Sequence, residues 1–302
     1  MRSNRRERGA GFTRVDAREL GPAIAEGRTA VVHAFGAGQV IKAFRDEIPK
    51  TDALIEAAIC RAVSDLNLPM PRFVDIVEIS GGFGLVFDRI DGLTMVDGSA
   101  GNRWRYARLG WSLGRIHVRL HAVRAPQGTA IPAQKTRLRE KIDGAAEGLT
   151  AELRAAAIAR LDALPSGDRI CHGDFHPENV LIADGQTFVI DWIDAAIGSP
   201  LGDVARTVVL VWLNPLPDRT RDRLQGWLRR SSFLGSYLAA YFLLSRRSLR
   251  ALRAWMPVVA AGRLRELKQG ETARLRAYLE RALRKTPLAR NLPRRTRGRR
   301  CA

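Results

Sequence analysis

Three polar side chains, Asp174, Asn179 and Asp191, have the types and the spacing that phosphoryl-transfer chemistry uses. Asn179 follows Asp174 by five residues, and Asp191 follows Asn179 by twelve. A carboxylate on a loop can accept a proton from a substrate hydroxyl. A carboxamide and a second carboxylate offer oxygen ligands for Mg²⁺, which binds nucleotide phosphates at the same time. The trio therefore predicts magnesium-assisted phosphoryl transfer with Asp174 next to the acceptor.

A short hairpin is expected to bring the two metal-ligand candidates together. Apolar runs predict strands at Val180–Ala183 and Thr187–Ile190, joined by the turn Asp184-Gly185. The ends of an antiparallel hairpin are adjacent, so Asn179 and Asp191 become neighbours. Taken singly, these residues are also ordinary turn formers or strand caps. We expect Asp191 to be buried in an apolar strand, where a carboxylate needs a cation.

The first third of the chain is expected to be rich in strands, with one helix. Thr51 is the predicted cap of a helix that runs to about Leu66. Alternating apolar residues and intervening glycines predict four strands, at Val31–Phe35, Gln39–Phe44, Phe73–Ser80 and Leu85–Ile90.

The rest of the chain is expected to be mostly helical, at 102–121, 138–164 and 201–283. The fold class is thus α+β, with an antiparallel β-rich N-lobe, a helical C-lobe and a cleft between them. The expected divisions are a basic lead-in over 1–20, the nucleotide-binding N-lobe over 21–87, a hinge over 88–92, the C-lobe over 93–283 with the catalytic loop and acceptor pocket, and a basic, disordered tail over 284–302.

Charge and composition narrow the function classes. The net charge is +19, and 281–302 holds nine Arg or Lys residues and no acid, so the tail could bind an anionic partner non-specifically. Three distant cysteines and no CxxC pair favour a cytoplasmic protein without structural disulfides. The apolar stretch Ser232–Leu244 has 13 residues, too short for a bilayer span of about 20, and predicts a buried helix.

Three motifs together resemble a known family. His172-Gly-Asp174, Ile190-Asp191-Trp192 and Gly198-xxx-Gly-Asp203 are similar to motifs of the aminoglycoside phosphotransferase and choline kinase-like family of small-molecule kinases, which have a protein kinase-like fold. The resemblance covers roughly residues 20–270. It implies that Asp174 is the catalytic base, that Asn179 and Asp191 bind Mg²⁺, and that ATP or GTP is the co-substrate.

The same resemblance implies supporting roles in the C-lobe. His172 would brace the catalytic loop through hydrogen bonds, and Asp203 would hold that loop from the following helix. The alternative for Asp203 is a simple helix cap. His117 and His121 stand four residues apart on one predicted helix, a spacing that also suits zinc. Val118 stands where an HExxH motif has glutamate, so we expect packing or local hydrogen bonding instead.

In the N-lobe, the resemblance assigns nucleotide binding to five residues. Lys42 matches the strand lysine that contacts the α- and β-phosphates, and Glu56 is its expected ion-pair partner, ahead of Asp52 and Glu47. Gly27 lies where a loop would cover the phosphates. The Asp88 carbonyl and the Ile90 amide are expected to bind the base at the hinge.

The acceptor is the open question. Between Val204 and Arg265 there are twelve arginines and two acids, Asp218 and Asp222. Polycationic aminoglycosides need carboxylates, so the balance favours a neutral or anionic hydroxyl compound. Two alternatives remain open: a nucleotide-binding regulatory pseudo-kinase, which would not need the full set of site residues, and a protein kinase-like enzyme. Against the second, His176 replaces the lysine of many protein kinases, and no APE-type segment follows Asp191.

Overall fold

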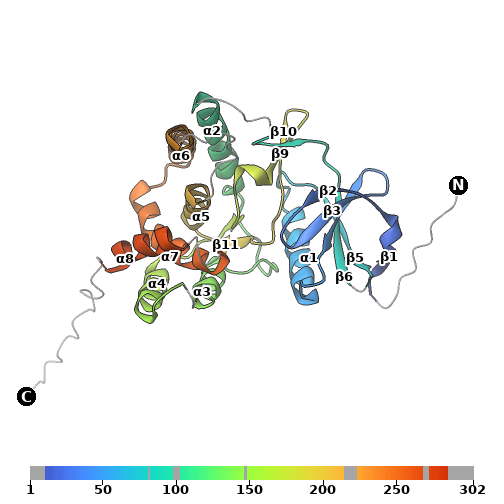
Figure 1. Cartoon of the computed structure of the whole chain (residues 1–302), viewed down its shortest axis with the longest axis horizontal. Helices are drawn as coiled ribbons and strands as arrows, with labels where there is room; N and C mark the ends of the chain where they lie inside the picture. Colours follow the sequence, from blue (N-terminus) through green and yellow to red (C-terminus); the bar gives the residue numbers. More distant parts are fainter. Residues whose placement is uncertain are drawn as a thin grey trace, which may run out of the picture.

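The computed structural model describes residues 11–80, 82–97, 103–145, 148–213, 223–267 and 272–284. Within these ranges a sheet-rich lobe is followed by a helical lobe (Figure 1). This is the two-lobed α+β arrangement that the sequence predicts. The predicted disordered tail, apart from Arg284, lies outside the described residues, as do 1–10 of the predicted lead-in.

The first lobe is a six-stranded sheet with the strand order β1-β5-β6-β4-β3-β2. All neighbouring strands are antiparallel except β1 and β5. The helix α1 (Lys50–Ser64) joins β4 to β5. The strands are β1 (Thr13–Val15), β2 (Leu20–Glu26), β3 (Ala30–Phe35), β4 (Gln39–Phe44), β5 (Phe73–Ile79) and β6 (Gly82–Asp88).

Strand β4 is central, so its side chains alternate between two covered faces. Ile41 is fully buried, in a small apolar cluster with residues of β1, β3, β5 and β6. Lys42 points to the opposite face, where its ammonium reaches α1. The turn before β4 is tight, because Gly36 and Gly38 have φ of +53° and +77°, values that glycine adopts readily.

Two sequence-based expectations for this lobe are wrong. Thr13–Val15 is a strand of the sheet rather than part of a lead-in, because it pairs with β5 in the register Thr13↔Val77, and a short 3-10 helix at Ala17–Glu19 leads from it to β2. Thr51 does not cap α1: Pro49 occupies the cap position, and no side chain bonds the first turn. Proline suits a helix start because its φ is fixed near the helical value and because it has no amide N–H that would need a partner.

The lobes are joined by residues 89–92 and by a small second sheet. Strand β7 (Leu93–Thr94) pairs with β9 (Val180–Ala183), which pairs with β10 (Gln186–Val189). The turn between β9 and β10 has Asp184 and Gly185 at positive φ, as a two-residue hairpin requires. The predicted hairpin is therefore confirmed. A third, two-stranded sheet pairs β8 (Arg169–Cys171) with β11 (Ala196–Gly198).

Helices make up most of the second lobe, as predicted. Two of them, α2 and α6, pack closely because α2 has glycines on the facing side. A Cβ on Gly110 would lie 2.1 Å from the Phe233 carbonyl oxygen, and one on Gly114 would lie 2.6 Å from that of Tyr237. The helices are α2 (Arg103–Leu120), α3 (Gln134–Asp143), α4 (Ala151–Ala163), α5 (Pro200–Leu213), α6 (Arg223–Ser245), α7 (Leu249–Arg263) and α8 (Ala273–Arg284).

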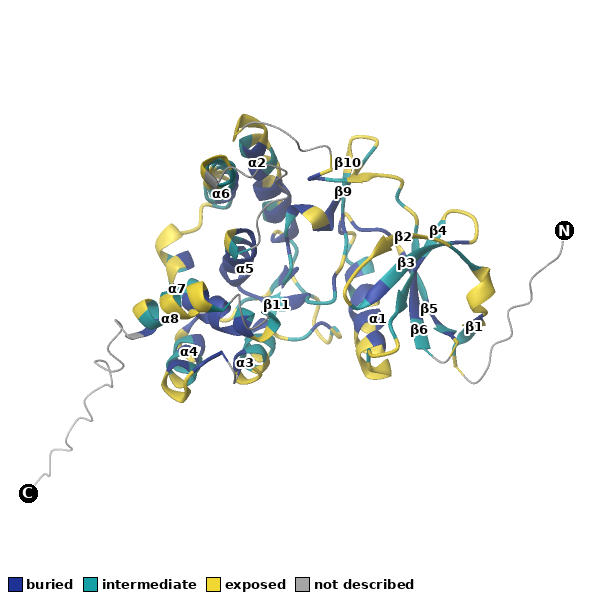
Figure 2. Cartoon of the chain, viewed as in Figure 1, coloured by how far each residue is buried: buried dark blue, intermediate teal, exposed yellow. Residues whose placement is uncertain are grey.

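The apolar stretch 232–244 lies within α6 and is a core helix on one side. Phe233, Tyr237 and Tyr241 are fully buried against α2, whereas Leu243 is 69% exposed. Among the described helices, none has the length and apolarity to cross a bilayer. Figure 2 shows the buried residues of α2, α5 and α7 facing one another inside the lobe.

The main apolar core runs through both lobes. It joins Ala57 and Cys60 of α1 and Leu85 of β6 to the buried residues of the helical lobe, such as Trp192 and Trp255. This continuity fixes the position of the 171–192 segment relative to the N-lobe sheet. Cys60 and Cys171 are buried free thiols, and Cys301 lies outside the described residues.

Candidate active site

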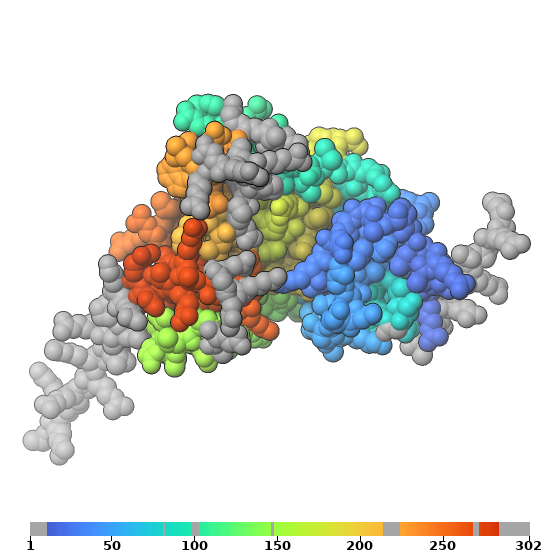
Figure 3. All heavy atoms as spheres, in the orientation of Figure 1, coloured from blue at the N-terminus to red at the C-terminus, as the bar shows by residue number. Residues whose placement is uncertain are grey.

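The predicted lysine–glutamate pair is present at the junction of the lobes. Lys42 Nζ lies 2.6 Å from Glu56 Oε1 on α1, and 2.9 Å from Asp191 Oδ1, which comes from the second lobe. Lys42 therefore connects the N-lobe sheet and helix to the segment after the hairpin. Figure 3 shows the blue N-lobe and the orange and red helices on opposite sides, with the yellow-green segment of this site between them.

Lys42 is charged in this setting. Burial opposes the charge and is the largest effect on its pKa, but Asp191 and Glu56 together raise that pKa above its usual range. Burial also raises the pKa of Glu56, against the opposing effect of Lys42. Because Lys42 keeps its proton throughout the neutral range, Lys42 and Glu56 form an ion pair.

The loop that carries Asp174 depends on a glycine. Gly173 has a φ of +79°, and a Cβ there would lie 2.1 Å from the Asp194 carbonyl oxygen. Only glycine fits this position without displacing the neighbouring segment. The loop and the 191–196 segment are thereby held in direct contact.

Asp203 holds the loop from α5 through its buried carboxylate. Its Oδ2 accepts from the His172 amide at 2.6 Å, and its Oδ1 accepts from the Gly173 amide at 2.9 Å. Burial alone would raise its pKa, but hydrogen bonds from His117 and His121 hold that pKa well below the usual range. Asp203 therefore bonds the catalytic loop, not the start of its own helix.

His117 and His121 meet the expectation of local hydrogen bonding. Their Nε2 atoms lie 3.1 Å and 3.2 Å from Asp203 Oδ2. Their Nδ1 atoms each lie 2.8 Å from a phenol oxygen, of Tyr237 and Tyr241 respectively. Neutral rings that donate from Nε2 and accept from tyrosine hydroxyls satisfy every group. The two histidines and Asp203 lie close enough to hold a metal, but this network already uses their ligand atoms.

His172 braces the loop from inside. Its Nε2 lies 3.0 Å from the Ile190 carbonyl oxygen, and its Nδ1 accepts from the Asp174 amide at 3.2 Å. This pattern requires a neutral ring with the proton on Nε2. Burial lowers the pKa of His172, in keeping with a neutral ring. One imidazole thus ties the residue before Asp191 to the residue that carries the catalytic candidate.

Asn179 lies where the hairpin geometry predicts. The Ile190 amide donates to the Asn179 carbonyl at 3.0 Å, which continues the β9–β10 ladder by one residue. Its side-chain nitrogen donates to the Asp174 carbonyl oxygen at 2.9 Å and lies 3.4 Å from Asp174 Oδ2. The amide Oδ1 is the atom left for a cation.

Asp191 departs from its predicted environment. Its side chain is 40% exposed, and the residue follows β10 instead of ending a buried strand. Its φ of +63° turns the chain out of the hairpin, a conformation that aspartate tolerates better than most residues. The expectation that burial forces a cation onto Asp191 is therefore wrong. Lys42 contacts Oδ1, and the accessible carboxylate, beside Asn179, retains lone pairs that suit a hard cation.

Asp174 is ionised by its surroundings. Its Oδ1 lies 3.5 Å from Arg206 Nη2, and its Oδ2 lies 3.5 Å from His176 Nε2. Burial would raise its pKa, but the hydrogen bond with His176 and the charge of Arg206 bring that pKa below the usual range. Asp174 is thus a ready hydrogen-bond acceptor at neutral pH.

Sequence reasoning missed Arg206. Its Nε donates to the Gly173 carbonyl at 3.0 Å, and its Nη2 lies 2.7 Å from Glu266 Oε2. Burial lowers its pKa, but Glu266, Asp174 and Asp194 together raise it above the usual value. Its position three residues after Asp203 places both on one face of α5, which is the signal that could have identified it.

The predicted phosphate-covering loop is the β2–β3 connection. Gly27 lies directly after β2, and its amide donates to the Ala30 carbonyl at 2.9 Å. Arg45 holds the loop from the end of β4: its Nη2 lies 3.2 Å from the Gly27 carbonyl oxygen and 2.5 Å from Glu26 Oε1. The sequence did not single out Arg45.

The predicted hinge residues lie at the end of β6. Asp88 is the last residue of that strand; its amide donates to the Arg72 carbonyl at 3.0 Å, and its carboxylate pairs with Arg72. The Ile90 carbonyl accepts from the Gly92 amide at 3.1 Å. These contacts fix the conformation of the connector. That the Asp88 carbonyl and the Ile90 amide bind the nucleotide base stays a prediction.

The site as a whole brings a buried cation, three carboxylates and a carboxamide to the junction of two lobes. A carboxylate next to a hydroxyl site, with oxygen ligands and an ammonium on its N-lobe side, can position a phosphate donor and an alcohol. The chain offers each of these groups on a rigid element or on a loop with several anchors.

Comparison with known proteins identifies the family of the chain. A family model described as the phosphotransferase enzyme family matches residues 23–255. A search of curated proteins finds no match.

Several solved structures share this fold at low sequence identity. The chain is similar to a thermostable mutant of aminoglycoside phosphotransferase APH(4)-Ia (TM-score 0.59, 19% identity, 87% of this chain and 93% of the other). It is also similar to the amicoumacin kinase hAmiN in complex with AMP-PNP, Ca²⁺ and Ami (0.57, 15%, 91% and 91%). A third is a choline/ethanolamine kinase family protein from Mesorhizobium loti (0.55, 16%, 90% and 90%). At these identities the likeness shows the fold alone.

Proposed function

Because this chain belongs to the phosphotransferase enzyme family, we propose that it transfers the γ-phosphoryl group of ATP or GTP to a hydroxyl of a small molecule. The observation that carries the proposal is the contact of Lys42 with both Glu56 and Asp191, since it links the nucleotide lobe to the catalytic segments. Asn179 pairs with the residue before Asp191 at the end of the hairpin, and its side chain donates a hydrogen bond to the Asp174 carbonyl.

Asp174 is the proposed catalytic base, in a particular sense. A pKa below the usual range makes a carboxylate a weak base, and proton transfer to it is unfavourable early in the reaction. Phosphoryl transfer through a loose transition state needs little early deprotonation of the alcohol. Asp174 therefore orients the hydroxyl by accepting its hydrogen bond, and takes the proton late.

Asn179 and Asp191 are the proposed Mg²⁺ ligands. The carboxylate of Asp191 is accessible, and the nitrogen of Asn179 is bonded to Asp174, which directs the use of its oxygen. This oxygen donor set fits a hard divalent cation. Mg²⁺, when bound, would neutralise charge on the nucleotide phosphates. Lys42 would bind the α- and β-phosphates, with Glu56 keeping its ammonium in place.

The remaining nucleotide contacts come from the N-lobe and the connector. The Gly27 loop, held by Arg45, would cover the phosphates. The Asp88 carbonyl and the Ile90 amide would bind the base. One acceptor and one donor can pair with either adenine or guanine, so both ATP and GTP are proposed as co-substrates. His172 and Asp203 support the site without touching substrate.

A neutral or anionic acceptor is the proposed substrate class. A mutant of aminoglycoside phosphotransferase APH(4)-Ia, 19% identical to this chain, forms a ternary complex with ADP and hygromycin B. At that identity its acceptor does not indicate the acceptor of this chain. In this chain Arg206 contacts Asp174, and Arg137, Lys141 and Arg263 line a cavity beside the same loop. Positive groups this close to the proposed base disfavour a polycationic acceptor.

The test is phosphate transfer with Mg²⁺ and ATP or GTP across a library of hydroxyl compounds. Asp174→Asn and Asp191→Asn should each lower kcat by at least about 10²-fold. Asp184→Asn is the matched control, because it lies in the hairpin turn and asparagine suits its positive φ. Turnover of neither nucleotide, with binding intact, would establish the pseudo-kinase alternative, and transfer to protein substrates only would establish the protein kinase-like one.

A further inference from the structure

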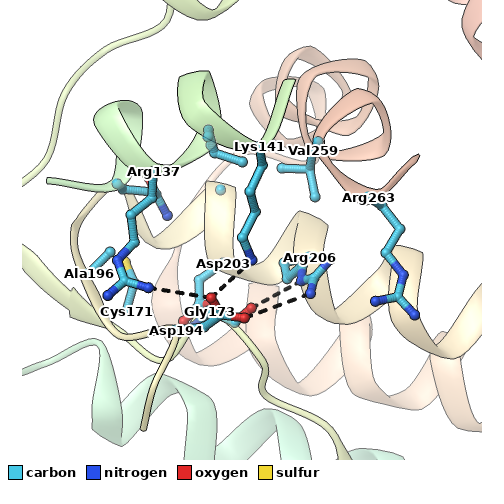
Figure 4. A pocket seen from close by; sticks show the side chains of 14 residues that line it. Arg137, Lys141, Cys171, Gly173, Asp194, Ala196, Asp203, Arg206, Val259 and Arg263 are labelled. Atoms are coloured by element: carbon cyan, nitrogen blue, oxygen red, sulfur yellow. Dashed lines mark hydrogen bonds and ion pairs between the residues drawn. The ribbon is translucent and has the colours of Figure 1, made fainter. Parts of the chain in front are cut away.

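A small cavity lies next to the loop that carries Asp174. It is lined by residues of α3, α5, α7 and the segment after Asp191, and Gly173 forms part of its wall (Figure 4). Its volume is about 40 Å³. That is room for roughly three waters, so it suits one functional group and not a whole substrate.

Positive side chains converge on this cavity. Arg137 and Lys141 come from α3, Arg206 from α5 and Arg263 from α7. Figure 4 shows the first three directed at the carboxylate of Asp194.

The four cations of the cavity are matched in number by four carboxylates, but their hydrogen-bond donors are not all used. These four cations form ion pairs with three carboxylates, Asp174, Asp194 and Glu266. Asp203 also lines the cavity, but its oxygens bond the histidines and the loop amides. Three guanidinium groups and one ammonium carry many more N–H donors than these acceptors use.

Two of those donors are buried and unmatched. The Nε atoms of Arg137 and Arg263 have no hydrogen-bond partner among the described residues, although the Nη1 atoms of both are paired, with Asp194 and Glu266 respectively. Burial also lowers the pKa of Arg137 despite the nearby Asp194 and Glu140. Buried donors normally have a partner. Arg154 and Arg230 also have an unmatched Nε but do not line this cavity, so it is the convergence of Arg137 and Arg263 on one cavity that points to a ligand.

We propose that the cavity binds an oxyanion group, a carboxylate or a phosphate monoester, carried by the phosphate acceptor and held by Arg137 and Arg263. This inference rests on the proposed function and deepens it. The planar N–H fork of arginine matches both oxyanions in geometry. Arg206 borders the cavity and also contacts Asp174, so an acceptor whose oxyanion group is bound here lies within one side chain of Asp174.

Direct binding of the free anion tests the site without any turnover. The full chain, with its nucleotide site filled by Mg²⁺ and AMP-PNP, is titrated by calorimetry with inorganic phosphate and, separately, with acetate, at constant ionic strength. We expect saturable binding of at least one anion, which identifies the group. Arg137→Gln and Arg263→Gln should each weaken it by about tenfold or more, the loss expected for a charged hydrogen bond.

Arg139→Gln is the matched control. Arg139 is on α3 as well, but it is 43% exposed and pairs with Asp162, away from the cavity, so its loss should leave anion affinity unchanged. Should a glutamine variant fail to fold, Arg137→Lys keeps the charge, lacks the fork, and should still weaken binding. No saturable binding of either anion, or equal affinity in all variants, overturns the proposal.

Acceptor kinetics separate this inference from the proposed function. Each compound that accepts phosphate is compared with its analogue without the carboxylate or phosphate. Anionic members should have at least about tenfold higher kcat/KM, and Arg263→Gln should remove that preference. Equal transfer to neutral alcohols would leave the kinase proposal standing and reject the anion site. Absence of any transfer would reject the kinase proposal, while the calorimetric result stands independently.

Discussion

Acid should destabilise this fold through the buried ring of His121. The ring is buried between Asp203 and Tyr241, and burial, together with the neighbouring His117, lowers its pKa from 6.5 to about 3. In the unfolded chain the ring binds a proton near pH 6.5. Between these two values only the unfolded state is protonated, so the free energy of unfolding falls as the pH falls.

The size of the effect follows from this window. Each pH unit below the unfolded pKa costs about 1.4 kcal/mol, so lowering the pH from 7 to about 4.5 should remove about 3 kcal/mol through His121 alone. Other groups also titrate, and for that reason the measurement is a difference between two proteins. His121→Gln removes the titrating ring and keeps an N–H donor for Asp203.

Urea unfolding monitored by circular dichroism at both pH values provides the assay. The glutamine variant should lose about 3 kcal/mol less than the wild type between the two pH values, whatever its stability at pH 7. A pH dependence equal in the two proteins would show that His121 is not held neutral, and that the proposed proton positions of the Tyr–His–Asp network are wrong.

Four further substitutions test other contacts. Lys42→Met leaves Glu56 buried beside Asp191 without its cation; it should abolish nucleotide binding by calorimetry and lower the urea-derived stability by about 3 kcal/mol. Gly110→Ala forces a methyl group against a carbonyl of α6 and should lower the free energy of unfolding by more than about 2 kcal/mol. Gly235→Ala is its control: the added methyl group meets open space, so the free energy of unfolding should rise by up to about 1 kcal/mol. Arg206→Lys loses the fork that joins Gly173 to Glu266; steady-state kinetics should give a kcat reduced about tenfold or more at unchanged nucleotide KM, and equal reductions in kcat and nucleotide affinity would contradict its assignment to the acceptor side.

The site could be anticipated where its geometry is local. The Asn179–Asp191 spacing is read from a two-residue hairpin, whose turn type fixes which residues face each other. Lys42 lies in a strand with clear alternation, and Glu56 follows fourteen residues later on the next helix.

Contacts between distant segments were not accessible in this way. Arg206 and Glu266 are 60 residues apart, and β1 pairs with a strand more than 60 residues away, so no local period carries either contact. The environment of Asp191 was misjudged because apolar neighbours in sequence suggested a buried strand. The backbone leaves that strand two residues earlier and turns to positive φ.

The carboxylate of Asp203 has a consequence for how this protein can change. It is bonded at once to two amides of the catalytic loop and to a histidine pair that is itself held by α6. Small displacements of α2 or α6 are thereby transmitted to the backbone beside Asp174. Substitutions far from any substrate can therefore slow the chemical step without unfolding the chain. Mutational scans of α2 and α6 should measure turnover as well as protein abundance.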